Sequence, residues 1–218
     1  MPIPLTVLIS GNGSNLKAIQ AAIDRGECDA SISAVIADRK KAPGLEYARE
    51  RQLHTEVVRP RDYPDREAWN DALCQTVARF EPQVVVLAGF MRIVGPAFVQ
   101  RFAGRVLNVH PALLPAFPGT DGPAQALAAG VRVTGCTVHV VDEGVDTGPI
   151  VAQAVVRVLK GDDPDTLHAR IQAAEHRLFP HVIAEVARGG ITLGERPVIE
   201  TATEDPQLFF SPPLPDAT

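Results

Sequence analysis

The first 110 residues alternate short apolar runs with segments whose apolar residues recur at helical spacing. Runs this short and this rich in β-branched residues are typical of strands buried on both faces of a parallel sheet. Strands and helices in alternation, with right-handed crossovers, predict an α/β fold with a Rossmann-like, mostly parallel sheet and flanking helices. The expected strands are residues 5–9, 32–37, 54–58, 84–88 and 106–110. The run at 84–88 is the most apolar, which favours a central position in the sheet.

Beyond residue 115 the pattern changes. Residues 134–141 and 149–158 alternate as antiparallel strands do, and an acidic, glycine-rich connection joins them. They predict a hairpin beside the edge of the parallel sheet. A long helix is expected over 163–188, because two glycines follow it. Residues 191–218, rich in proline, predict a peripheral hairpin and a loose tail.

The composition indicates a compact globular protein. The 218 residues are 45% hydrophobic and 22% charged, which is far from a disordered composition. A net charge of -5 argues against a general binder of nucleic acid or membrane surfaces. Three cysteines, Cys28, Cys74 and Cys136, are widely spaced and do not follow metal-ligand spacing. No apolar run approaches the roughly 18–20 residues that span a bilayer. A cytoplasmic protein without a metal is therefore expected.

A glycine-rich loop, Ser10-Gly-Asn-Gly-Ser-Asn15, joins the first expected strand to the first helix. Glycines allow a tight turn, and the free amides at a helix start suit an anion such as phosphate. A plain turn that uses glycine for its geometry alone is the alternative. Leu16 stands three residues after Gly13, where a dinucleotide site has glycine. Asp38, which ends the second strand, could still hold a ribose, so an NAD-dependent oxidoreductase stays open.

Asn108 and His110 lie two residues apart, so on a strand their side chains share one face. One is a neutral donor, and the other carries a proton near neutral pH. Asp146, in the acidic connection, can favour the imidazolium and raise its pKa if the hairpin folds over His110. Taken singly, His110 also fits a core strand and Asp146 a turn. Because no serine or cysteine lies within local reach, direct attack on a carbonyl is favoured over an acyl-enzyme.

The apolar patch at 89–94 follows the most apolar expected strand directly and contains one arginine. In doubly wound folds, ligands bind at the carboxyl edge of the sheet. The patch is therefore a candidate floor for a flat aromatic ligand, with core packing as the alternative.

Four runs together resemble a known family. They are residues 10–15, Ala88-Gly-Phe-Met-Arg92, Asn108-Val-His-Pro-Ala-Leu-Leu-Pro115 and Asp142-Glu-Gly-Val-Asp-Thr-Gly-Pro149. Their order and spacing resemble the folate-dependent phosphoribosylglycinamide formyltransferases of purine biosynthesis, over about residues 3–190. In that family the formyl group of 10-formyltetrahydrofolate passes to the amine of glycinamide ribonucleotide.

The resemblance implies a formyltransferase fold with a C-terminal antiparallel hairpin. It also implies one formyltransferase domain over residues 1–190, followed by a peripheral segment, 191–218. Within that domain, residues 1–104 would form the phosphate-binding half. Residues 105–190 would form the catalytic and folate-binding half.

The resemblance also assigns roles to residues. Asn108, His110 and Asp146 would be catalytic. Substrate phosphate would be held by Gly13, Ser14 and Asn15, and Glu175 would contact glycinamide ribonucleotide. The residues expected at the folate are Arg66, Met91, Arg92, Ile93, Val94 and Asn108. Methionyl-tRNA formyltransferases and formyltetrahydrofolate deformylases share the catalytic trio, so the phosphate loop narrows the choice.

The implied partners are two small molecules, glycinamide ribonucleotide and 10-formyltetrahydrofolate as co-substrate, with no metal, nucleic acid or membrane. The resemblance allows for a homodimer. Two alternatives remain open. A formyltetrahydrofolate deformylase would send water to the formyl group, although such enzymes carry an added N-terminal domain. A nucleotide-binding module without catalysis predicts that His110 and Asp146 lie far apart.

Overall fold

The computed structural model describes residues 1–194 and 196–199. Its main feature is a seven-stranded sheet in the order β3-β2-β1-β4-β5-β6-β7. The first five strands run parallel, and β6 and β7 continue the sheet antiparallel. Their bounds are β1 Ile3–Ile9, β2 Ala30–Ala37, β3 Thr55–Val57, β4 Val84–Leu87, β5 Val106–His110, β6 Val133–Val140 and β7 Ile150–Arg157. The Rossmann-like sheet, the central position of β4 and the antiparallel hairpin at the sheet edge are therefore confirmed.

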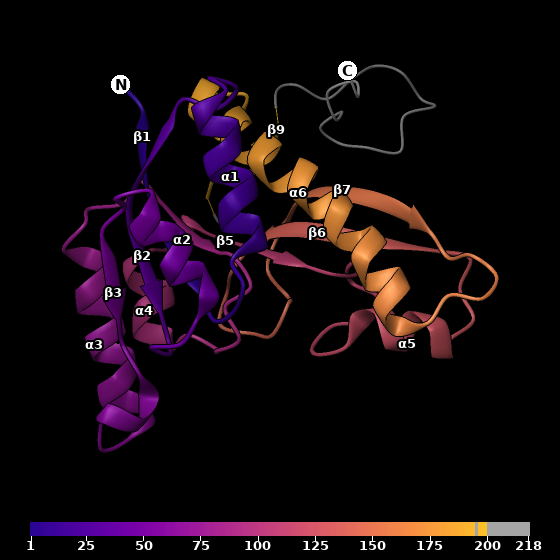
Figure 1. Ribbon diagram of the computed structural model, residues 1–218, viewed down its shortest axis with the longest axis horizontal. Coiled ribbons are helices and arrows are strands. Elements are labelled where there is room, and N and C mark those ends of the chain that lie inside the picture. Colours follow the sequence, from indigo (N-terminus) through magenta and orange to yellow (C-terminus); the bar gives the residue numbers. More distant parts are fainter. Residues whose placement is uncertain (195, 200–218) are drawn as a thin grey trace.

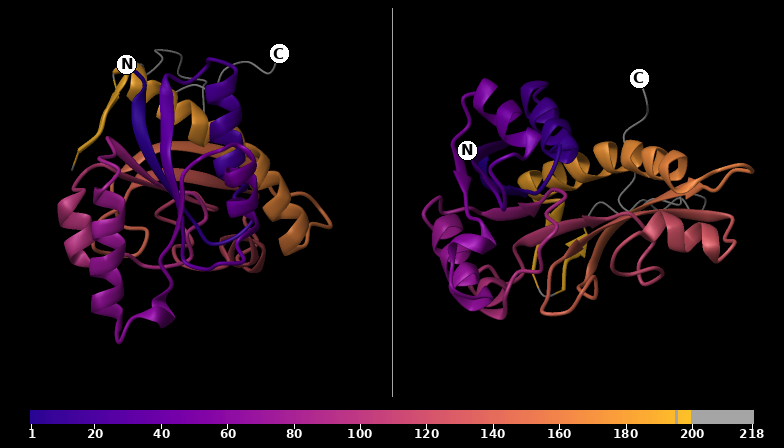
Figure 2. Two further views of the ribbon diagram at one scale, coloured as in Figure 1. Left: turned by 60° about the vertical axis from the view of Figure 1, so that its left-hand side comes forward. Right: turned by 60° about the horizontal axis from the view of Figure 1, so that its bottom comes forward.

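Helices cover both faces of this sheet, as Figures 1 and 2 show. One core cluster contains side chains of α1 (Ser14–Asp24), α2 (Pro43–Glu50) and α6 (Pro164–Arg188). The other contains side chains of α3 (Arg66–Ala78) and α4 (Pro96–Arg101). A 3-10 turn, Pro60–Asp62, precedes α3, and α5 (Gly122–Ala128) lies near the first turns of α6. The flanking helices expected from the alternation are present.

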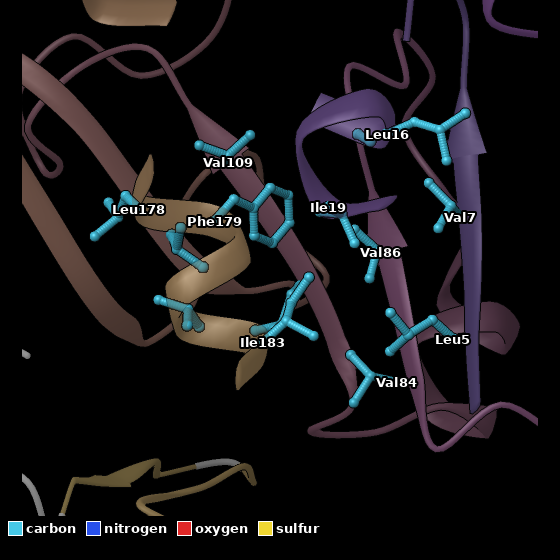
Figure 3. Packing of buried hydrophobic residues seen from close by; sticks show 14 of the residues in the cluster. Leu5, Val7, Leu16, Ile19, Val84, Val86, Val109, Leu178, Phe179 and Ile183 are labelled. Carbon is cyan, nitrogen blue, oxygen red and sulfur yellow. The ribbon is translucent and has the colours of Figure 1, made fainter. Parts of the chain in front are cut away.

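Alternating side chains of each strand enter the two clusters, because successive strand residues point to opposite faces. Leu5, Val7, Val84 and Val86 face α1 and α6, where they meet Leu16, Ile19, Phe179 and Ile183 (Figure 3). Leu8, Val85 and Leu87 face the cluster of α3 and α4. Such β-branched strands pack well when both faces are covered.

The long helix α6 begins and ends as its sequence predicts. The Asp163 side chain accepts from the Thr166 amide, and the Thr166 hydroxyl accepts from the Asp163 amide, which together form a capping box. Pro164 occupies the first turn, and Gly189, with φ at 80°, ends the helix. Strands β8 (Ile191–Thr192) and β9 (Val198–Ile199) then form the expected antiparallel hairpin. The tail expected beyond residue 199 lies outside the described residues.

The carboxyl ends of the parallel strands gather the loops that the sequence singled out. Ser10 follows β1, Asp38 follows β2, residues 88–95 follow β4, and His110 ends β5. Along β5, Leu107 and Val109 enter the cluster beneath α6, so Asn108 and His110 point to the opposite face. In the described part of the chain no helix is long and apolar enough to span a membrane.

Candidate active site

His110 and Asp146 meet although 36 positions separate them. The loop between β6 and β7 folds back over β5, and Nδ1 of His110 lies 3.3 Å from Oδ2 of Asp146. Nε2 of His110 lies 2.8 Å from the carbonyl oxygen of Phe117. Both ring nitrogens of His110 therefore face hydrogen-bond acceptors. The prediction that the hairpin brings Asp146 to His110 is confirmed.

Asp146 is held as a carboxylate. Its Oδ2 accepts from the Gly119 amide at 2.8 Å. Burial raises the pKa of Asp146, but the hydrogen bond with His139, the Gly119 amide and the nearby His110 outweigh burial and hold it below its usual value. The backbone φ of Asp146 is 54°, in the left-handed region that glycine, asparagine and aspartate tolerate best. Aspartate therefore serves this position in two ways. It tolerates the left-handed backbone, and it places a negative charge beside His110.

His139 is a site residue that the sequence reasoning missed. Strand β6 pairs with β5 so that His139 stands opposite Asn108. Nε2 of His139 lies 3.1 Å from Nδ2 of Asn108 and 3.6 Å from Oδ1 of Asp146. Its Nδ1 lies 3.1 Å from the Val140 carbonyl oxygen. Nε2 of His139 thus lies beside both the Asn108 amide and the Asp146 carboxylate, so His139 positions these two members of the trio relative to each other.

The trio opens into a pocket of about 670 Å³. Asn108, His110 and Asp146 line it together with Met91, Arg92, Ile93 and Val94, the run that the sequence placed at a folate. Arg66 does not line this pocket. It lines a second cavity of about 540 Å³, which shares Met91, Arg92 and Ile93 with the first. There Nη2 of Arg66 donates to the Ile93 carbonyl oxygen at 3.3 Å. The main pocket is lined by residues from both sides of position 104, the expected boundary between the two halves of the domain.

The glycine loop is backed by the first turn of α2. The Gly44 amide donates to the Gly11 carbonyl oxygen at 3.1 Å. Gly13, with φ at 66°, precedes α1 and offers no side-chain cap to its first amides. Those amides are therefore available to an anion, in line with the sequence prediction. Ser14 is the first residue of α1, directly after Gly13.

Asn15 and Glu175, expected at one substrate, do lie together. Nδ2 of Asn15 donates to Oε2 of Glu175 at 2.9 Å. Burial raises the pKa of Glu175 to about 7, against the opposing effect of the Asn15 hydrogen bond. Within the described residues, the buried Oδ1 of Asn15 has no hydrogen-bond partner. A substrate hydroxyl or amine placed here would satisfy it.

Asp38, considered above for a ribose, is already engaged. Its carboxylate accepts from Arg39 and Arg92, so a ribose would have to displace an arginine. The geometry therefore does not favour a dinucleotide site. Among residues 1–194 and 196–199, no group of three or more His, Cys, Asp or Glu side chains is placed to hold a metal ion.

Known proteins are similar to this chain in both sequence and fold. The formyl transferase family matches residues 4–183, most of the chain. The chain belongs to the formyl transferase family. The phosphoribosylglycinamide formyltransferase of Mycobacterium tuberculosis strain H37Rv is 52% identical over 193 residues, which cover 88% of each chain. That of Escherichia coli strain K12 is 43% identical over 191 residues, or 88% of this chain and 90% of the relative.

Solved structures agree with the sequence comparison. The glycinamide ribonucleotide transformylase 1 of Symbiobacterium toebii superposes with a TM-score of 0.87 at 44% identity, over 91% of this chain and 94% of that chain. The resemblance and the fold predicted from the sequence are therefore confirmed. The chain is an enzyme, a formyltransferase of purine biosynthesis. The alternative of a module without catalysis required His110 and Asp146 to be far apart, which the 3.3 Å contact contradicts.

Proposed function

We propose that the enzyme transfers the formyl group of 10-formyltetrahydrofolate to the amine of 5-phosphoribosylglycinamide. The observation that carries this proposal is the His110–Asp146 pair, 3.3 Å apart, beside Asn108 in one pocket. A neutral donor and a charged proton carrier on one strand face suit a carbonyl that becomes an oxyanion. The relatives' names support phosphoribosylglycinamide as the formyl acceptor, and the family resemblance supports 10-formyltetrahydrofolate as the donor.

The proposed reaction is a direct attack without a covalent enzyme intermediate. The substrate amine forms a bond to the formyl carbon, and Asn108 with protonated His110 stabilises the oxyanion that develops. Measured in other enzymes, one such donor contributes about 3–4 kcal/mol to the transition state. Collapse of the intermediate breaks the carbon–nitrogen bond to the folate. Asp146 keeps His110 charged and helps the amine proton reach the departing folate nitrogen.

The proposed binding residues form two groups, one for each substrate. The loop residues Gly13, Ser14 and Asn15 would hold the substrate phosphate at the start of α1, and Glu175 would contact the rest of that substrate. The folate would lie against Met91, Arg92, Ile93, Val94 and Asn108. Met91 is 71% exposed and Ile93 53% exposed, so burial under a flat ring would be favourable. Arg66, in the adjoining cavity, would meet an anionic end of the folate that reaches beyond the main pocket.

The deciding experiment is a formyl-transfer assay with glycinamide ribonucleotide and 10-formyltetrahydrofolate, run beside a reaction without the amine substrate. We expect formylated product and tetrahydrofolate in equal amounts, and little formate. Formate release that does not depend on the amine would identify a deformylase instead. In His110→Asn, turnover should fall at least a hundredfold. Near-normal turnover in that variant would contradict the assigned proton carrier.

The remaining expectations are part of this proposal. Residues 1–190 would constitute the formyltransferase domain, with its phosphate-binding half over 1–104 and its catalytic and folate-binding half over 105–190. Cytoplasmic residence and a homodimer stay predictions. Fractionation and sedimentation of the purified enzyme would test them.

A further inference from the structure

Asp38 is a buried carboxylate that holds two arginines at the end of β2. Its side chain is 0% exposed. Oδ1 accepts from Nε of Arg39 at 3.1 Å, and Oδ2 accepts from Nε of Arg92 at 2.8 Å. Burial raises the pKa of Asp38, but hydrogen bonds from Arg39, Arg92 and Ser10 outweigh burial and keep it below the usual value. Because an unpaired charge is costly to bury, loss of these partners would destabilise the ionised Asp38 side chain.

Ser10 closes this arrangement from the neighbouring strand β1. Its Oγ accepts from the Met91 amide at 2.8 Å, and its own amide donates to the Gly89 carbonyl oxygen at 3.1 Å. The Ser10 hydroxyl also lowers the pKa of Asp38, as a polar group close to the carboxylate does. Strands β2, β1 and β4 are adjacent in the sheet. Ser10 and Asp38 therefore both bind the loop at 89–92, Ser10 through Gly89 and Met91 and Asp38 through Arg92, at three neighbouring strand ends.

These residues reach both proposed substrate sites. Ser10 directly precedes the glycine loop at 11–15. Met91 and Arg92 line the larger pocket, beside Asn108 and His110. Arg39 binds the same carboxylate, yet it is half-exposed and lines neither described pocket. The chain thus offers two arginines on one aspartate, only one of which touches the site.

We propose that Asp38 is a positioning residue that couples occupation of the phosphate loop to the shape of the folate pocket. This inference rests on the proposed function, since it takes the two sites to be those of glycinamide ribonucleotide and the folate. A phosphate bound at residues 11–15 fixes Ser10. Through Asp38 and the Met91 amide, Ser10 then fixes the loop that receives the folate. Linkage requires the effect to be reciprocal, so each ligand tightens the other by the same factor.

The test measures the dissociation constant of tetrahydrofolate with and without saturating glycinamide ribonucleotide. Tetrahydrofolate carries no formyl group, so the ternary complex cannot turn over. In the parent enzyme we expect the nucleotide to tighten tetrahydrofolate binding at least about fivefold. Asp38→Asn should bring this factor close to one and should raise KM for the formyl folate more than it lowers kcat. Arg92→Gln should behave likewise, and the matched Arg39→Gln should keep the parent factor.

The outcomes separate the coupling from a scaffold role. A parent factor near one overturns the coupling, even where formyl transfer itself is normal. Weaker binding of both ligands in Asp38→Asn with the factor retained also overturns it, because Asp38 would then only support the fold. If Asp38→Asn fails to fold, Arg92→Gln against Arg39→Gln decides, and equal factors in these two overturn the proposal. A parent that binds neither compound overturns the proposed function, and this inference with it.

Discussion

At the scale of single residues, the surroundings of two carboxylates shift their pKa values away from the ordinary values. Asp146 is partly buried yet stays ionised, because His139, Gly119 and His110 stabilise its charge. Glu175 is buried against the neutral amide of Asn15, and burial raises its pKa to about 7. The pKa values of these two carboxylates are therefore shifted in opposite directions. Replacing each carboxylate by the corresponding amide tests what its charge does.

Asp146→Asn should keep the fold and lose most of the activity. Asparagine tolerates the φ of 54° and can still accept from the Gly119 amide, so the backbone should not move. Without the negative charge, His110 loses the group that favours its imidazolium. We expect kcat to fall at least a hundredfold and the pH–rate profile to change shape, measured from pH 5 to 9. The control is Glu143→Gln, an exposed change in the same loop. A profile in Asp146→Asn that superposes on the parent's would refute the role of Asp146.

Glu175→Gln should change how stability depends on pH. The pKa of Glu175 is raised from 4.5 to about 7, so the folded state disfavours its charged form. The parent should therefore lose stability as pH rises through this range, and the glutamine variant should not. Unfolding free energies of the two should be similar below pH 4.5. At pH 8 the variant should be more stable by about 3 kcal/mol, because glutamine has no charge to bury.

Urea unfolding at several pH values measures this difference, with Glu50→Gln, exposed at the end of α2, as the control. A constant offset between parent and Glu175→Gln across the whole pH range would show that Glu175 has an ordinary pKa.

At the scale of elements, the sequence predicted the strands and helices well because their signals are local. Short β-branched runs indicated the five parallel strands, alternation indicated β6 and β7, and the two glycines after residue 188 indicated the end of α6. Register is not a local property, and His139 was missed for that reason. Its position in an alternating strand was visible, but its place opposite Asn108 depends on how β6 slides along β5. The separation of Arg66 from the main pocket likewise follows from how α3 packs.

Gly44→Ala should weaken binding of the phosphate-bearing substrate. A Cβ at Gly44 would lie 2.7 Å from Cδ1 of Ile9, 3.1 Å from Cα of Gly13 and 3.2 Å from the Gly11 carbonyl oxygen. Two of these three atoms are backbone of the glycine loop, so the loop must shift. We expect KM for glycinamide ribonucleotide to rise about tenfold, or roughly 1.4 kcal/mol, with a smaller effect on kcat. Glu46→Ala, an exposed change on the same helix, is the control. Equal KM values in the two variants would contradict a supporting role for α2.

At the scale of the whole molecule, the two halves drawn from the sequence share one sheet. Strand β4 pairs with β5 across the boundary at 104, and α6 packs its Phe179 and Ile183 against the same cluster as Leu16 and Ile19 of α1. The sequence suggested the two halves through the family resemblance, which places their boundary at residue 104. It could not show that α6 returns to cover the first half, because that contact joins residues about 160 positions apart, as Asn15 and Glu175 illustrate.

A fragment of residues 1–104 should therefore fail to fold cooperatively. It would lack α6 and expose the edge of β4 that β5 covers, which leaves apolar surface and unpaired backbone groups in water. Residues 1–199 should instead unfold in one transition that circular dichroism and Trp69 fluorescence report at the same urea concentration. A soluble, cooperatively folded 1–104 fragment, or two separate transitions in the longer chain, would show that the halves are independent.

The face of β5 that carries Asn108 and His110 has a further consequence. The helical layer of α3 and α4 packs on that face as far as Val106, and the pocket begins where this layer ends. The missing part of the layer is thus the place where the proposed folate would lie. A bound folate would act as a removable piece of the protein interior, packing against the sheet as a helix does elsewhere. Ligand affinity can then be measured by heat denaturation, because a ligand at a hundredfold excess over its Kd stabilises the folded state by about 2.7 kcal/mol.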